Sequence, residues 1–355
     1  MAKMLIRGGD LDLVEYDFEP FGLGEHINDI GLKKDYQLTI QQEMITAILP
    51  ARIHLTVLDM NRFAPNRPGG GGIGFALQLY STVEVTCCAG ESEIDYERAP
   101  IIAHSIEVFK HVTGYKGGFK VRVVDHERRH IGLGSTGSVL TGLYAAMNKA
   151  VGSPLGSEEF RLLMGNNYVE ETADGQVVPG FETGVGPAVV LYGGMSVMGD
   201  ELTQVCNHPF GSEHNVFIII PPTDACASGE DEFQVLMNRA RSLDYRDREL
   251  KAYMVLMDLI PALCRDDVDK IGDVIWEIEF RGSKRAEVEH NSFEIYHYMS
   301  KLRDAGLEFV GMSSVGPSIS VVTKKSREEV DAIVESMGLS VAIETNVDNA
   351  GIRLS

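Results

Sequence analysis

The chain has 355 residues, 44% of them hydrophobic and 24% charged, which indicates a globular protein of one large domain or two ordinary ones. Its formal net charge of −20 argues against a general nucleic-acid binder, because that affinity depends on Lys and Arg that neutralise phosphates. There is no membrane-length apolar segment, no signal-peptide core and no Cys-x-x-Cys pair, so we expect a cytoplasmic protein without membrane span, zinc or iron–sulfur cluster.

Residues 1–45 form an extension of mixed composition in which only a short strand, at 10–16, is predicted. Alternating apolar residues then predict further strands, over 44–57, 73–88 and 118–125. Four consecutive glycines at 69–72 indicate a loop, since ordering them in a regular element costs backbone entropy. Apolar residues at helical spacing predict helices, over 103–113, 139–150 and 158–166.

The second half of the chain places strands and helices in blocks. Apolar runs predict strands over 217–220, 319–323 and 340–344. Helices are predicted over 231–265, 267–280, 292–305 and 327–337. The Tyr and Met residues of 253–257 are expected to lie in the core. The blocks of strands and helices, without strict alternation, predict an α+β fold.

A glycine-rich segment directly precedes the helix predicted at 139–150. Residues 132–138 contain three glycines and three hydroxyl residues. A glycine-rich turn that opens a helix directs backbone N–H groups and the positive end of the helix dipole at one point, which favours phosphate. The alternative is an ordinary tight turn with a Ser N-cap. The segment is not a Walker A motif, because no Gly-Lys-Ser/Thr follows.

Two further clusters carry polar groups that fit an anion site. Arg52 and His54 share one face of the strand predicted at 44–57, where they could meet a phosphate or carboxylate, unless this is a solvated edge strand. Asp59 follows as a candidate metal ligand, base or turn residue. The Gly/Ser segment 311–318 precedes the strand at 319–323 and, taken alone, is typical of a hairpin loop.

These clusters, in this order, resemble the three motifs of the GHMP small-molecule kinase superfamily over roughly residues 48–345. The central loop is similar to its Gly-Leu-Gly-Ser-Ser phosphate loop, 311–318 to its C-terminal glycine-rich motif, and 181–194 to the segment between them. The resemblance implies a two-domain α+β fold, with a ribosomal-protein-S5-like α/β domain at 46–210, a ferredoxin-like α+β domain at 211–355, and 1–45 as an extension.

Within the superfamily the chain is most similar to the β-ribofuranosylaminobenzene 5′-phosphate synthases of methanopterin biosynthesis. The matching positions are Pro50, Arg52, Ile53, His54, Leu58, Asp59, Asn61, Gly71, Gly72, Gly74, Ala76, Leu77, His130, Gly132, Leu133, Gly134, Ser135, Gly311, Ser313, Ser314, Gly316 and Pro317. This resemblance implies transfer of phosphoribosyl from phosphoribosyl pyrophosphate to the ring carbon of 4-aminobenzoate or 4-hydroxybenzoate, with loss of CO2 and pyrophosphate.

The resemblance and the loop chemistry together imply a set of site residues. Those expected to be catalytic are Arg52, His54 and Asp59. Those expected to bind phosphate are His130, Gly132, Gly134, Ser135, Thr136, Gly137, Ser138, Ser313, Ser314 and Gly316. Those expected to contact substrate are Gly71, Gly72 and Glu182. A magnesium ion, Mg2+, is expected on Ser135 and Asp59, with Glu182 as another possible carboxylate ligand.

Other implied features concern the rest of the molecule. Lys284 and Arg285 are candidates for the 5′-phosphate of the substrate, unless they form a solvated helix end. The partners expected are small molecules and, by analogy, a second copy in a homodimer, with no nucleic acid and no membrane.

The chain departs from both relatives at particular positions. True kinases of the superfamily carry a catalytic Asp in the middle segment, and the aligned residue here is Gly186, which favours the synthase over a kinase. The synthases commonly carry an Asp at Gly70, a Glu at Gln78 and a basic run at 178–182. An ATP-dependent kinase and a non-catalytic protein that binds a phosphorylated metabolite therefore stay open as alternatives.

Overall fold

The computed structural model describes residues 3–8, 12–17, 19–63, 67–126, 132–172, 174–222 and 239–355. Its largest element is a seven-stranded sheet with the order β10-β9-β4-β3-β15, to which β6 and β5 are added beside β4. The strands are β3 (Ile45–Val57), β4 (Gly72–Cys88), β5 (Glu93–Asp95), β6 (Gly118–Val124), β9 (Met195–Met198), β10 (Gln204–His208) and β15 (Arg353–Leu354). The last strand, β15, thus returns the end of the chain to the first sheet.

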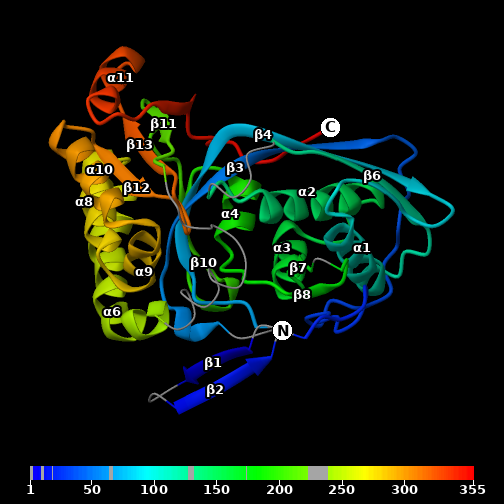
Figure 1. Cartoon of the computed structure of the whole chain (residues 1–355). Coiled ribbons are helices and arrows are strands. Elements are labelled where there is room, and N and C mark those ends of the chain that lie inside the picture. Colours follow the sequence, from blue (N-terminus) through cyan, green and yellow to red (C-terminus); the bar gives the residue numbers. More distant parts are fainter. Residues whose placement is uncertain are drawn as a thin grey trace.

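Four helices cover one face of this sheet (Figure 1). They are α1 (Ala99–Thr113), α2 (Ser135–Ala150), α3 (Ser157–Asn166) and α4 (Val185–Tyr192). Their apolar sides pack on the sheet in a cluster that includes Leu49, Phe109 and Leu143, all fully buried. Burial of such side chains from water is the main stabilising term of this layer.

A second sheet of four strands has the order β12-β13-β11-β14. Its strands are β11 (Asn215–Ile219), β12 (Phe309–Met312), β13 (Ile319–Thr323) and β14 (Val341–Thr345). The helices that follow β11 in the chain are α6 (Arg241–Met254), α7 (Ile260–Leu263), α8 (Val268–Glu279), α9 (Gly282–Asn291), α10 (Phe293–Asp304) and α11 (Arg327–Glu335). Figure 1 shows α6, α8, α9 and α10 gathered at the left end of the long strands. The α+β prediction is confirmed.

Small elements complete the described chain. A hairpin of β1 (Lys3–Gly8) and β2 (Asp12–Asp17) confirms the strand predicted at 10–16, and β7 (Val169–Glu171) pairs with β8 (Val177–Pro179). Single turns of 3-10 helix occur at Met60–Arg62 and Asp200–Leu202, and a π-helical turn at Val255–Leu259. In the described part of the chain, no helix has the length and apolar character needed to cross a membrane.

A register shift in the β3–β4 ladder decides which side chains face the helices. The shift lies between Pro50 and Ala51. Before it, Leu49 packs in the cluster with α1 and α2, whereas after it Ile53 packs in the cluster with α8. Because an irregularity of this kind exchanges the faces of a strand, Arg52 and His54 point into the protein beside α2 and α4.

Two expectations about burial and helix limits are wrong. Met254 is buried as expected, but Tyr253 and Met257, also expected in the core, are 61% and 54% exposed, because α6 and the π-helical turn bury their other side. Helices α4 and α9 lie outside the predicted elements. Both are short and begin at or beside a glycine, so their apolar pattern gives little helical periodicity.

One contact of residues 19–44 predicts how stability depends on pH. His104 of α1 is buried, its Nδ1 accepts a hydrogen bond from the Gly24 N–H at 3.2 Å, and burial lowers its pKa to about 4. A histidine whose pKa is lower in the folded state stabilises the protein above the unfolded pKa, and this stability is lost as the pH falls toward the folded pKa. Between pH 7 and pH 5 we expect His104 to remove about 2 kcal/mol of unfolding free energy.

Urea unfolding of the parent and of His104→Gln at both pH values measures this contribution. The variant should lose less stability on acidification, whereas His111→Gln, at an exposed position of the same helix, should behave as the parent. Equal pH slopes for the parent and for His104→Gln would contradict the prediction.

Candidate active site

The three predicted motifs meet beside His54 of β3. The Ser313 hydroxyl donates to the Gly132 carbonyl at 2.7 Å and accepts the His54 N–H at 3.2 Å. The Ser314 N–H donates to the His54 carbonyl at 2.6 Å. Ser313 therefore links the strand to both glycine-rich loops, and its hydroxyl is committed to protein groups. The phosphate contact expected of Ser313 stays a prediction.

The glycine at position 132 is required by this close packing. Its φ is +89°, and a Cβ there would lie 2.5 Å from the Ser313 carbonyl oxygen. A side chain would therefore meet both backbone strain and a rigid neighbour. The loop is held in place by contacts that only a glycine permits.

Helix α2 begins at Ser135, four residues earlier than predicted, and so starts inside the glycine-rich loop. No side chain caps its N-terminus among the described residues, and Gly134 has a φ of +62°. The first N–H groups of a helix have no partner within the helix and carry the positive end of its dipole. The backbone from Ser135 to Ser138 is therefore suited to bind an anion.

The hydroxyl groups of this loop have different positions. Ser138 is buried and its hydroxyl donates to the Gly134 carbonyl at 3.2 Å, so its O–H proton is directed at the loop, and its phosphate contact stays a prediction. Thr136 is partly exposed on the first turn. His130 lies outside the described residues, and so does the side chain of Ser135.

Arg52 lies directly beneath this helix end. A Cβ on Gly134 would collide with its guanidinium, and a Cβ on Gly186 would lie 3.2 Å from its Nε. Its Nη1 is buried without a hydrogen-bond partner among the described residues. Burial lowers the pKa of Arg52, and the negative charge of Glu182 opposes this shift. The alternative of a solvated edge strand is therefore wrong.

His54 is 7% exposed, and its Nε2 lies 3.3 Å from the Thr183 Oγ1. Burial lowers the pKa of His54 well below its usual value, and the charges of Arg52 and Lys284 lower it further. A Cβ on Gly72 would lie 3.1 Å from the same Nε2. Burial and these charges therefore disfavour the protonated imidazole, which lies against the predicted substrate loop 69–72.

Glu182 brings a carboxylate to the same place. Its Oε1 accepts the Gly184 N–H at 2.6 Å, and its Oε2 would lie 3.7 Å from a Cβ on Gly137 of α2. Its carbonyl accepts the Gly69 N–H at 3.1 Å, which joins the two loops. Burial raises the pKa of Glu182, while the Gly184 N–H and Arg52 lower it.

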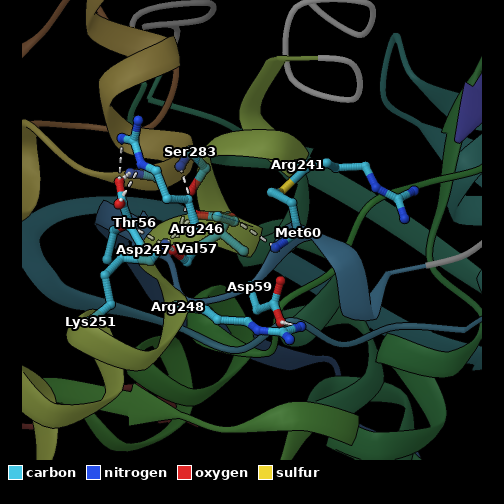
Figure 2. Close-up of polar contacts among 12 residues, drawn as sticks. Thr56, Val57, Asp59, Met60, Arg241, Arg246, Asp247, Arg248, Lys251 and Ser283 are labelled. Carbon is cyan, nitrogen blue, oxygen red and sulfur yellow. Dashed lines mark hydrogen bonds and ion pairs between the residues drawn. The ribbon is translucent and has the colours of Figure 1, made fainter. Parts of the chain in front are cut away.

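Asp59 has a structural role in the turn that follows β3. Its Oδ1 accepts hydrogen bonds from the Asn61 N–H and Nδ2, both at 2.9 Å, and its Oδ2 lies 3.8 Å from Arg248 Nη1. These contacts are those of a turn residue. In this structure the carboxylate is held by α6 and its own turn (Figure 2), and the catalytic and metal-binding roles expected of Asp59 stay predictions.

A buried ion pair beside this turn fixes the end of β3. Lys251 of α6 pairs with Asp244, and both side chains are 0% exposed. The Lys251 ammonium also donates to the Val57 carbonyl at 3.0 Å, and Asp244 accepts the N–H groups of Met60 at 2.8 Å and Ser283 at 2.7 Å (Figure 2). Helices α6 and α9 are thus tied to the strand that carries Arg52 and His54.

Lys284 holds the third motif, the Gly/Ser segment 311–318, through a hydrogen bond to its backbone. Its ammonium is buried and donates to the Glu287 carboxylate at 3.0 Å and to the Ser314 carbonyl at 2.8 Å. Ser314 has a φ of +51°, a conformation that non-glycine residues rarely adopt. Neither alternative for Lys284 is therefore correct, since it lies neither at a solvated end nor free for phosphate. Arg285 pairs with Glu289 at 2.7 Å and is partly exposed.

The site also contains residues that sequence patterns did not indicate. Thr183 contacts His54, and Arg98 of the α1 N-terminus contacts Thr136 on α2. Thr183 stands next to Glu182 in the chain and could have been proposed on that ground. Arg98 precedes the glycine-rich loop by more than 30 residues and shares no motif with it.

The donor set limits where a metal ion could bind. The described residues contain no group of three or more His, Cys, Asp or Glu side chains placed to hold one. Among the described residues, the Glu182 carboxylate lies beside the N-terminus of α2. Magnesium in phosphate sites is commonly held by one or two carboxylates together with substrate oxygens, so Glu182 fits this ion.

Curated proteins similar in sequence share one name. The chain is 26% identical over 330 residues to the beta-ribofuranosylphenol 5'-phosphate synthase of Methanothermobacter thermautotrophicus, a match that covers 85% of this chain and 96% of that protein. It is 25% identical over 337 residues to the synthase of the same name from Archaeoglobus fulgidus, covering 88% and 99%. No protein-family model matches the chain.

Solved structures with the same fold are more distant in sequence. The mevalonate diphosphate decarboxylase of Staphylococcus aureus superposes with a TM-score of 0.64 at 15% identity, covering 88% of this chain and 98% of that one. The homoserine kinase of Cytophaga hutchinsonii superposes with a TM-score of 0.61 at 15% identity, covering 91% and 100%. The chain therefore has the fold of the GHMP kinase superfamily, and its resemblance to the ribofuranosyl phosphate synthases is confirmed by relatives that match it over most of its length.

Proposed function

We propose that this protein is a phosphoribosyltransferase that joins the ribose 5′-phosphate of phosphoribosyl pyrophosphate to the ring of a 4-substituted benzoate, with loss of CO2 and pyrophosphate. The main support is the Arg52 guanidinium beneath the N-terminus of α2, because in the described part of the chain its Nη1 is buried without a hydrogen-bond partner and no side chain caps the helix. The names of the curated relatives, which specify a ribofuranosylphenol phosphate, favour 4-hydroxybenzoate over 4-aminobenzoate as acceptor.

The proposed reaction needs no base for an alcohol. The bond from ribose C1′ to the pyrophosphate oxygen breaks and its electrons leave with pyrophosphate, while the ring carbon that carries the carboxylate bonds to C1′. The bond to the carboxylate carbon then breaks, its electrons return to the ring, and CO2 departs. The position that carries the catalytic Asp in the kinases is Gly186, where Arg52 Nε occupies the neighbouring space. A positive charge there suits a departing anion.

Each residue of the site has a role that follows from its chemistry. The N–H groups at the start of α2 and the Arg52 guanidinium stabilise the negative charge that develops on pyrophosphate. Neutral His54 accepts a hydrogen bond from the hydroxyl or amino substituent of the ring and so favours attack by the opposite carbon. Glu182 would hold a magnesium ion, which supplies further charge neutralisation to the diphosphate when bound.

A mass-spectrometric assay tests this proposal. Purified protein is incubated with phosphoribosyl pyrophosphate, Mg2+ and either 4-hydroxybenzoate or 4-aminobenzoate, and the C-ribosyl product, pyrophosphate and CO2 are measured. We expect all three products in equal amounts. Release of neither pyrophosphate nor CO2, together with ATP-dependent phosphorylation of an alcohol, would establish a kinase instead. Diphosphate binding without any turnover would indicate a non-catalytic relative.

A further inference from the structure

Arg98 connects the start of α1 to the first turn of α2. Its Nη1 donates to the Thr136 Oγ1, while its Nε donates to Glu171 at 2.8 Å and its Nη2 to Glu170 at 2.7 Å. The Arg98 side chain is 17% exposed. Three donors of one planar group are therefore committed in different directions, which fixes the orientation of the guanidinium.

The hydrogen bond from Arg98 determines what the Thr136 hydroxyl can do. A hydroxyl has one O–H donor and two acceptor lone pairs. Because Arg98 donates to the oxygen, the O–H of Thr136 must point to a different acceptor. Thr136 is the second residue of α2, among the N–H groups that the helix leaves unpaired, and it is partly exposed.

We propose that Arg98 is a positioning residue of the anion site, which acts through Thr136 by directing its hydroxyl toward the diphosphate of the donor substrate. The inference rests on the proposed function in that it takes a diphosphate as the anion. Glu170 and Glu171 keep the guanidinium on Thr136, and the Tyr168 hydroxyl holds Glu170 in turn at 2.7 Å.

A purely structural role for Arg98 makes a different prediction. If the residue only joined α1 to β7, its removal would lower the stability of the fold and leave the affinity of properly folded protein for an anion unchanged. If it acts through Thr136, removal weakens anion binding, and the loss depends on whether the hydroxyl is present. A double-mutant cycle separates the two roles.

The experiment measures binding of inorganic pyrophosphate with Mg2+ by isothermal titration calorimetry. Arg98→Gln and Thr136→Val should each bind about 10-fold to 100-fold more weakly than the parent, the range for a lost hydrogen bond to a charged group. The affinity of the double variant for pyrophosphate should be no lower than that of the single variant with the lower affinity. Arg98→Lys keeps the positive charge but lacks the planar guanidinium with its several donors, so its affinity for pyrophosphate should lie between those of the parent and Arg98→Gln.

The matched control is Arg122→Gln, which removes one positive charge from the exposed ion pairs of β6 with Glu84 and Asp95. It should bind pyrophosphate like the parent, and thermal melting checks that every variant is folded. If Arg98→Gln binds pyrophosphate as tightly as the parent, this inference is overturned and the proposed function is not. The same holds if Arg98→Gln weakens binding as much in the Thr136→Val background as in the parent. Failure of the parent to bind pyrophosphate overturns the proposed function as well.

Discussion

Replacing Arg52 with glutamine should lower kcat/KM for phosphoribosyl transfer by about 100-fold to 1000-fold, the cost of removing one donor to a developing oxyanion. The side chain of Arg52 is held between Gly134 and Gly186, and none of the residues that the structure describes makes a hydrogen bond to its buried Nη1. An anion is the natural partner for such a group, and glutamine supplies neither the charge nor the second donor. Steady-state kinetics with phosphoribosyl pyrophosphate as the varied substrate measure the loss.

The same substitution should leave the fold intact. Burial disfavours the charged form of Arg52, so its removal does not cost the stability that a satisfied ion pair would. We expect the free energy of unfolding of Arg52→Gln to stay within about 1 kcal/mol of the parent. A kcat/KM within a few-fold of the parent, or a loss of activity explained by unfolding, would show that Arg52 is not part of the catalytic machinery.

Replacing Lys251 with methionine should cost about 3–5 kcal/mol of unfolding free energy, because it leaves a buried carboxylate without its counter-charge. Lys251 and Asp244 are both fully buried and together hold Val57, Met60 and Ser283. The end of β3 would lose an anchor, so activity should fall at temperatures well below the melting point of the variant. Urea denaturation followed by circular dichroism measures the stability.

The double variant Lys251→Met/Asp244→Asn provides the control for this prediction. It removes the unpaired charge, and the single amide oxygen of asparagine can still accept one of the two N–H groups, so it should recover part of the lost stability. A double variant less stable than Lys251→Met would contradict the electrostatic explanation, and so would a single variant as stable as the parent.

The glycine-rich motifs were recognisable because their chemistry is local. A loop such as 132–138 must be glycine-rich to direct amides at one point, and this is visible in a few consecutive residues. The shared face of Arg52 and His54 also follows from the alternation of a strand. The resemblance implied that the motifs meet at β3, and in the structure the hydrogen bonds of Ser313 join them there.

Other features depend on residues far apart in the chain. Asp59 resembles a metal ligand in sequence, but α6 supplies Arg248 and the turn supplies Asn61, which occupy its oxygens. Lys284 resembles a surface residue until Glu287 and the Ser314 carbonyl enclose its ammonium. Burial and pairing of this kind arise only when separate elements pack together, so no local sequence pattern predicts them.

By itself the amino-acid sequence determined the α+β class, the glycine-rich loop at the start of α2 and the pair of Arg52 and His54 on one strand, since each depends on neighbours within a few residues. Only the tertiary structure decided that the β3–β4 register shift buries that pair, that Glu182 rather than Asp59 lies beside the loop, and that Arg98 reaches Thr136. The physical reason is that the charge environment and solvent access of a side chain are set by the elements packed around it, whatever their distance along the chain.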